Sequence, residues 1–214
     1  MMIPFASWTR TRSTLAAMRR HGWRILATPE TLRGSRGKRP PYWPEDDSPA
    51  PYALDNGAWG CFQRGASFDD DAFSWAVDVL GERAEWVVMP DVVADREATL
   101  EKAERWFGRL GGLRLLLAVQ DGMSAADVEP WLKRGDGIFV GGSTEWKLAT
   151  VRHWAPLARS HGQWCHVARV NTRKRIELCK HFGVDSVDGK SVVMVPSTLP
   201  MLDKAIRQQS LWGS

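Results

Sequence analysis

The sequence has little cysteine and no long apolar run, and each shortage excludes a class of protein. Its 214 residues include three cysteines, Cys61, Cys165 and Cys179, and no two of them have CxxC spacing. This pattern argues against a secreted disulfide framework and against a zinc ribbon. No apolar stretch approaches the roughly 20 residues of a membrane-spanning helix, and no secretory signal is recognisable at the N-terminus. We therefore expect a globular protein in a reducing, cytoplasmic setting, with no membrane as a partner.

The net charge of +4 is small but unevenly distributed along the chain. Residues 1–44 contain nine basic residues and one acidic residue, a balance of about +8, so the remainder carries about −4. Such asymmetry favours a polyanionic partner, of which nucleic acid is the commonest. A solvated basic face accounts for the charge equally well, and both interpretations stay open.

Eight short apolar runs alternate for the most part with segments of helical periodicity, which predicts a parallel sheet. The runs span residues 3–7, 24–28, 52–56, 86–91, 113–120, 137–141, 164–170 and 185–188. The helical segments span residues 68–80, 95–110, 125–133, 144–160, 172–182 and 199–208. Eight repeats predict a single domain over 1–214, a compact α/β fold of the (β/α)8 TIM-like barrel type, with a doubly wound open sheet as the alternative.

A stretch rich in proline and glycine interrupts this alternation. Five prolines and two glycines fall between Leu32 and Pro51. Proline lacks a backbone N–H and breaks helices, so we expect a basic, irregular loop in place of the second helix.

Acidic residues close several of the predicted strands. Asp55, Asp91, Asp121 and Asp188 lie at or just after strand ends, which form the active-site face of such a barrel. One such aspartate is most simply a turn or a helix cap. A set of carboxylates held together raises its members' pKa values and indicates a chemical task.

Five motifs that lie in order between residues 52 and 190 resemble those of the tRNA-guanine transglycosylases and their relatives that insert 7-deazaguanines into DNA. They are Leu54-Asp55-Asn56-Gly57-Ala58-Trp59, Met89-Pro90-Asp91, Val119-Gln120-Asp121-Gly122, Gly141-Gly142 and Gly183-Val184-Asp185-Ser186-Val187-Asp188. The resemblance implies that Asp188 is the covalent nucleophile and that Asp55 is a general acid or base beside the sugar carbon. It also implies that Asp91 and Gln120 read the base, while the paired glycines Gly141 and Gly142 let backbone N–H groups approach it.

The chain also departs from the tRNA enzymes. Those are longer and carry a Cys-x-Cys-x-x-Cys plus His zinc site after the nucleophile, whereas the 26 residues after Asp188 contain no Cys or His. The compact form is similar to the zinc-free, DNA-directed branch of phages and bacterial modification islands. It implies DNA and a free 7-deazaguanine base as partners, no zinc or other cofactor, and a bacterial host cell if a phage encodes the chain. The particular 7-deazaguanine, the strandedness of the DNA and the oligomeric state stay open.

Further residues are assigned from their chemistry. Trp59 follows Asp55 closely and is a candidate for stacking on a flat base. His166 is one of five histidines without metal-ligand spacing, so we expect a packed or hydrogen-bonded residue. Candidate nucleic-acid contacts are Arg33, Arg36, Lys38, Arg39, Arg169 and Lys190, although salt bridges within the protein are an equal alternative for the last two.

These observations predict an enzyme, a glycosyltransferase that exchanges guanine in DNA for a 7-deazaguanine such as 7-cyano-7-deazaguanine through a covalent aspartyl-sugar intermediate. Two alternatives use the same residues. One is a purine deoxyribosyl hydrolase with water as the acceptor, and the other is a catalytically silent barrel that binds nucleic acid.

Overall fold

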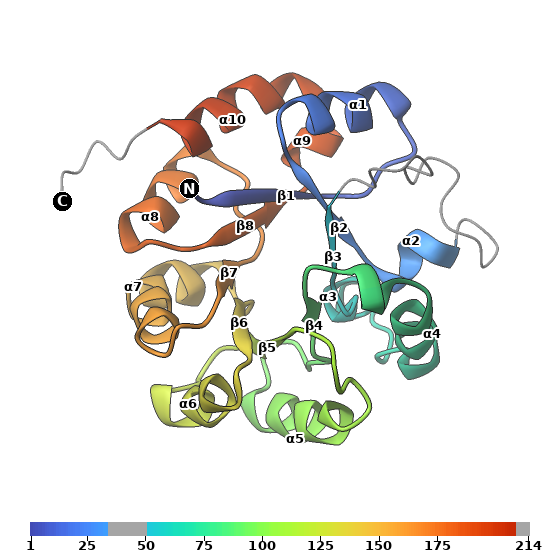
Figure 1. Ribbon diagram of the computed structural model, residues 1–214, viewed down its shortest axis with the longest axis vertical. Coiled ribbons are helices and arrows are strands. Elements are labelled where there is room, and N and C mark those ends of the chain that lie inside the picture. Colours follow the sequence, from blue (N-terminus) through green and yellow to red (C-terminus); the bar gives the residue numbers. More distant parts are fainter. Residues whose placement is uncertain (34–50, 209–214) are drawn as a thin grey trace.

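The chain folds into a closed barrel of eight parallel strands that follow one another in sequence order (Figure 1). The computed structural model describes residues 1–33 and 51–208. Strand β1 pairs with both β2 and β8, which closes the sheet and confirms the predicted (β/α)8 barrel. The strands are β1 (Ile3–Ser7), β2 (Arg24–Ala27), β3 (Tyr52–Leu54), β4 (Val87–Val88), β5 (Leu115–Val119), β6 (Gly137–Val140), β7 (Cys165–Val167) and β8 (Ser186–Gly189).

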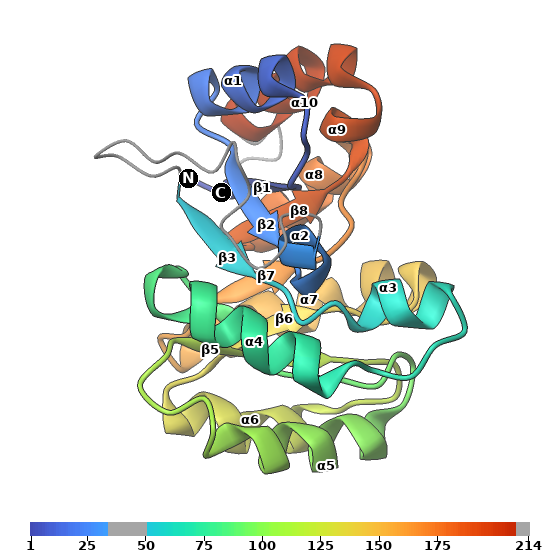
Figure 2. The ribbon, with the colours of Figure 1, turned by 90° about the vertical axis from the view of Figure 1, so that its right-hand side faces the viewer.

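Helices form a ring around the outside of this barrel (Figures 1 and 2). They are α1 (Arg12–Arg20), α2 (Pro29–Arg33), α3 (Ala58–Gln63), α4 (Asp70–Leu80), α5 (Arg96–Phe107), α6 (Ala125–Arg134), α7 (Thr144–Ser160), α8 (Arg173–Phe182), α9 (Ser191–Met194) and α10 (Leu199–Arg207). None of these helices is long and apolar enough to cross a lipid bilayer.

Four of the helices were not predicted: α1, α2, α3 and α9. Leu32 and Arg33, which we expected in the irregular basic loop, form the end of α2. The expected loop ends at Pro51, which directly precedes β3, and its residues 34–50 lie outside the described residues.

Side chains along each strand alternate between the barrel interior and the layer beneath the helices. The interior cluster contains Phe5, Trp86, Leu116 and Phe139, all of which are buried. A larger cluster fills the space between the strands and the helices. Side chains therefore fill the barrel interior, and the open space lies at the carboxyl ends of the strands, which form the rim of the barrel.

Candidate active site

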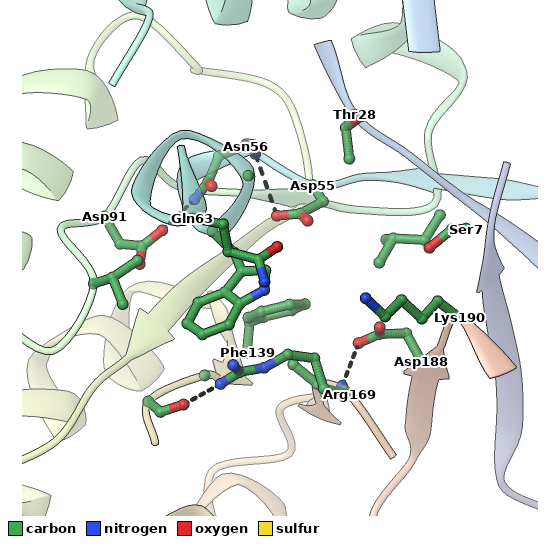
Figure 3. Close-up of a pocket in the computed structure, with 18 of the residues that line it drawn as sticks. Ser7, Thr28, Asp55, Asn56, Gln63, Asp91, Phe139, Arg169, Asp188 and Lys190 are labelled. Atoms are coloured by element: carbon green, nitrogen blue, oxygen red, sulfur yellow. Dashed lines mark hydrogen bonds between the residues drawn. The ribbon is translucent and has the colours of Figure 1, made fainter. Parts of the chain in front are cut away.

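A cavity of about 360 Å³ opens at the carboxyl ends of the strands (Figure 3). All eight strands, or the residues directly after them, contribute to its lining: Ser7, Leu26, Thr28, Asp55, Asp91, Gln120, Gly141, Ala168, Arg169 and Asp188 are among the lining residues. Small-molecule sites begin at about 300 Å³. The cavity is thus large enough for a compact ligand, and the structure brings Asp55, Asp91 and Asp188 together in it. Asp121 does not line the cavity, and its carboxylate instead accepts hydrogen bonds from the N–H and hydroxyl groups of Ser143.

Three carboxylates, Asp55, Asp91 and Asp188, line the cavity from different strands. Burial, together with the nearby charges of Asp188 and Asp91, raises the pKa of Asp55 to about 7. Burial also raises the pKa of Asp91 to about 6, partly offset by the hydrogen bond from Asn56. Figure 3 shows the carboxyl groups of Asp55 and Asp188 facing the same space from different walls. A carboxyl group with a pKa near 7 can both give and take a proton at neutral pH.

Asp91 is held by two amide side chains. Asn56 Nδ2 donates to Asp91 Oδ1 at 2.7 Å and to the Met89 carbonyl at 2.7 Å. Gln120 Nε2 donates to Asp91 Oδ2 at 2.6 Å. The backbone N–H of Asp91 also contributes a hydrogen bond to this carboxylate. Each carboxylate oxygen can accept about two hydrogen bonds, so Asp91 keeps some acceptor capacity towards the cavity that it lines. Sequence reasoning missed Asn56, whose position in the motif carried no signal of this contact.

The side chain of Gln120 makes three hydrogen bonds within the protein. Its Oε1 accepts the N–H groups of Gly142 at 3.1 Å and Ala94 at 3.2 Å, so both acceptor positions of this oxygen are used. Gln120 was expected to read the base through its side-chain amide. Of that amide, one Nε2–H bonds none of the described residues and remains for a ligand. Its principal contacts orient Asp91 and join the ends of β4, β5 and β6.

The paired glycines are required by the packing of the rim. A Cβ atom on Gly142, which has φ +61°, would lie 2.4 Å from Asp121 Oδ2, and one on Gly141 would lie 2.9 Å from Gln120 Nε2. The Gly141 N–H donates to the Val119 carbonyl at 3.0 Å, and the Gly142 N–H donates to Gln120. The expectation that these N–H groups are free to meet a base is therefore wrong for this structure, because both are engaged within the protein.

Asp188 is buried and anchored by one oxygen. Its Oδ1 lies 3.1 Å from His166 Nε2 and accepts the Arg169 N–H at 3.1 Å. His166 is fully buried, and its ring stacks on Phe139 with centroids 4.9 Å apart and planes 7° apart. Burial lowers the pKa of His166. The prediction that His166 is a packed and hydrogen-bonded residue is confirmed.

Arg169 links β7 to two other walls of the cavity. Its backbone has φ 58°, an uncommon conformation for a residue other than glycine and one that clusters at functional sites. Its guanidinium donates to the Gly142 carbonyl and lies 4.0 Å from the centroid of the Trp59 ring. Trp59 also stacks with Phe62. The Arg169 guanidinium therefore covers one face of the Trp59 ring in this structure.

The loop of Arg169 is supported from below by a buried lysine that sequence reasoning did not single out. Lys147 on α7 is fully buried, and its Nζ donates to the Ala168 carbonyl. Burial lowers the pKa of Lys147 to about 7, and the charge of Arg169 acts in the same direction.

The remaining predicted cations have different surroundings. Lys190 follows β8, and its amino group points into the cavity beside Asp188 (Figure 3). Arg33 is paired with Asp69 and does not line the cavity. Arg36, Lys38 and Arg39 lie outside the described residues. Within residues 1–33 and 51–208, no three His, Cys, Asp or Glu side chains gather in a way that could hold a metal ion.

Comparison with known proteins identifies the fold alone. No protein-family model matches the sequence. No curated protein matches it either. Among solved structures, the chain is similar to a candidate fructose-1,6-biphosphate aldolase from Coccidioides immitis, with 13% identity and a TM-score of 0.60, over 96% of this chain and 83% of that chain. At this identity the likeness shows a shared barrel architecture.

Proposed function

We propose that this chain is an enzyme that exchanges guanine in DNA for a free 7-deazaguanine such as 7-cyano-7-deazaguanine. The observation that carries the proposal is the meeting of Asp55, Asp91 and Asp188 in one cavity, each in a different hydrogen-bonding environment. The order of the motifs that contain them supports the same reaction.

Asp91 is suited to recognising guanine. Its pKa of about 6 leaves it mostly ionised at neutral pH, and a carboxylate that lines the cavity can accept from the two N–H groups of a guanine edge, the ring N–H and the exocyclic amine. Adenine offers no such pair and would leave Asp91 partly unsatisfied, which disfavours it strongly. The target base leaves the DNA stack to reach the cavity, as in other enzymes that act on a base.

Asp188 and Asp55 divide the chemistry between them. Asp188 Oδ2 attacks C1′ of the nucleotide, the C1′–N9 bond breaks, and its electron pair leaves with guanine, which takes a proton from Asp55. The incoming 7-deazaguanine then returns a proton from its N9 to Asp55, and N9 attacks C1′ while the bond to Oδ2 breaks. This is the double displacement of a retaining glycosidase with a base in place of water.

Binding of DNA is supported by the charge of the chain. The basic excess of residues 1–44 favours a polyanionic partner, and the Lys190 amino group at the cavity favours a phosphate group beside the site. Arg169 is not counted among these phosphate-facing groups, because its guanidinium bonds the Gly142 carbonyl and lies over the Trp59 ring.

The test is denaturing mass spectrometry of the full chain after incubation with guanine-containing DNA. We expect a protein–DNA adduct that is absent in Asp188→Asn and present in Asp185→Asn, a matched control on the same segment whose side chain bonds the Cys165 N–H. Addition of 7-cyano-7-deazaguanine should discharge the adduct and leave modified DNA.

Other outcomes identify the alternatives. Guanine release without incorporation would assign a hydrolase, and incorporation into tRNA alone would correct the substrate. No adduct, release or incorporation on either nucleic acid would leave a silent binding barrel.

A further inference from the structure

Behind Asp188 lies a buried chain of hydrogen bonds that the motif resemblance does not include. His166 lies directly opposite Ser186 in the pairing of β7 with β8. Ser186 and Asp188 are two residues apart on β8, so both point into the barrel interior. The Trp164 Nε1–H donates to Ser186 Oγ at 2.8 Å, Ser186 Oγ lies 2.8 Å from His166 Nδ1, and His166 Nε2 lies 3.1 Å from Asp188 Oδ1.

The directions of these hydrogen bonds follow from the chemistry of the groups. An indole N–H can only donate, so Ser186 Oγ accepts from Trp164. An ionised carboxylate can only accept, so His166 carries its proton on Nε2 and donates it to Asp188. The Nδ1 atom of the neutral ring then accepts the Ser186 hydroxyl proton. In this series of three hydrogen bonds, every donor therefore points towards Asp188.

The two oxygens of Asp188 are not equivalent. Oδ1 accepts from His166 and from the Arg169 N–H. Among the described residues, no donor bonds Oδ2, and Asp188 lines the cavity. His166 is held by aromatic packing, with Phe139 on one face and the Trp86 centroid 4.8 Å away. The position of the anchoring Nε2–H is thus fixed by the core of the barrel.

We infer that His166, oriented by Ser186, is a positioning residue that holds Asp188 through Oδ1 and directs Oδ2 at the sugar carbon. The inference rests on the proposed function. In the covalent intermediate Oδ2 is bonded to C1′ and Oδ1 becomes the ester carbonyl oxygen. The His166 N–H then stabilises the electron pair that returns to the carboxylate as the Oδ2–C1′ bond breaks.

The test compares His166→Gln with His166→Phe. Glutamine can place an N–H donor near the position of imidazole Nε2, whereas phenylalanine keeps an aromatic ring without a donor. We expect His166→Phe to slow adduct formation and discharge by roughly 10- to 100-fold and His166→Gln to stay within about fivefold of the wild type, as for loss and retention of a hydrogen bond to a charged group. The KM for the 7-deazaguanine should not change. His153→Phe, at an exposed histidine of α7, is the matched control.

Thermal unfolding of each variant separates positioning from folding. If His166→Phe does not fold, Ser186→Ala removes the hydroxyl that orients the ring and should slow both steps with the same unchanged KM. The inference would be overturned if a folded His166→Phe, or Ser186→Ala where His166→Phe does not fold, formed and discharged the adduct at the wild-type rates. Equal losses of rate in His166→Gln and His166→Phe would also overturn it.

A measurement without substrate distinguishes failure of this inference from failure of the proposed function. In ¹⁵N-labelled wild-type protein we expect a neutral His166 with its proton on Nε2, and a shift of that proton's resonance in Asp188→Ala. A proton on Nδ1 would overturn the inference whatever the activity. Absence of any adduct in a wild type with the expected tautomer would count against the proposed function alone.

Discussion

Asp55 and Asp188 are the same residue type in contrasting surroundings, and this contrast supports the roles proposed for them. Asp188 accepts two hydrogen bonds on one oxygen. Asp55 receives backbone N–H contacts from Gly57, at 3.5 Å, and from Asn56, and burial still raises its pKa to about 7. Environments that separate two carboxyl groups in this way commonly mark an acid–base group and a nucleophile.

Asp55→Asn should slow guanine exchange by roughly 10²- to 10⁴-fold, the usual contribution of a general acid or base. In the wild type, adduct formation should slow as the pH rises through about 7, because Asp55 then loses the proton that it gives to guanine. Adduct discharge should slow as the pH falls through the same region, because Asp55 must be ionised to accept the N9 proton. Single-turnover rates measured against pH check this, and a variant that keeps either pH dependence would contradict the role.

The same substitution should stabilise the fold. The pKa of Asp55 is raised on folding, so its ionised form costs stability above about pH 7 and the cost disappears as the pH falls towards the unfolded-state value. Asp55→Asn should therefore raise the free energy of unfolding by roughly 1 to 3 kcal/mol at about pH 8 and by less at about pH 5. Urea titrations at the two pH values measure the difference.

Gly142→Ala should destabilise the protein more than Gly122→Ala. Both glycines have positive φ, but a Cβ on Gly122 meets nothing within 4 Å, whereas one on Gly142 meets Asp121 and Trp146. Gly122→Ala isolates the backbone cost of roughly 1 kcal/mol, and Gly142→Ala should cost roughly 2 to 4 kcal/mol. Equal unfolding midpoints for the two variants would show that Asp121 and Trp146 shift to accommodate the added methyl group.

At the residue scale, the sequence predicted the acidic lining of the cavity but not the groups that orient it. Asp55, Asp91 and Asp188 could be found because they follow apolar runs. Asn56 and His166 could not be found from spacing, because their partners lie 35 and 22 residues away and meet them only through the register of the barrel.

At the scale of elements, the predicted strands all exist but several are shorter than expected. The run 86–91 contributes Val87–Val88 to the sheet, because Pro90 has no N–H for a ladder and Asp91 turns into the cavity. The helical segment expected from residue 68 begins at Asp70, because the side chain of Asp69 caps α4 by accepting the Ala72 N–H. Apolar periodicity thus predicts which strands and helices exist, whereas local residues such as Pro90 and Asp69 determine where they begin and end.

Helix α10 joins the two ends of the described chain through Asp203. This buried carboxylate accepts hydrogen bonds from the Trp23 indole at 3.1 Å and Arg207 Nε at 2.9 Å, and it lies 2.8 Å from His21 Nδ1. Burial alone would raise the pKa of Asp203, but the hydrogen bonds from Arg207, His21 and Trp23 lower it.

Asp203→Ala should reduce the free energy of unfolding by roughly 2 to 4 kcal/mol, because it leaves several donors without their acceptor. Asp203→Asn keeps an acceptor and should cost less. Because the folded-state pKa is lowered, the contribution is present above about pH 4 and is lost as the pH falls below it. Urea unfolding of the two variants is the measurement, and unchanged midpoints would contradict this account of α10.

At the scale of the whole molecule, the charge distribution makes a prediction about DNA binding. Neutralising Arg36, Lys38 and Arg39 together should weaken binding and flatten its dependence on salt by about one unit of slope per lost phosphate contact. Arg33→Ala should leave the slope nearly unchanged, because Arg33 is paired with Asp69. Fluorescence anisotropy across a salt series measures both, and an unchanged slope in the triple variant would exclude this segment from the interface.

The closure of the barrel could be anticipated only in part. Eight strand–helix repeats favoured a barrel, but the same alternation is compatible with an open sheet. The pairing that decides between them joins residues near opposite ends of the chain, such as Phe5 with Asp188, and local periodicity carries no information about it.

That seam between β1 and β8 has a consequence for synthesis of the chain. The last strand supplies the closing hydrogen bonds of the barrel and also Asp188 with the serine that orients His166. A nascent chain on the ribosome therefore has neither a sealed barrel nor the proposed nucleophile until β8 has emerged. Closure of the barrel and assembly of the proposed active site thus occur in the same event, and we expect a polypeptide that stops before β8 to lack the proposed activity.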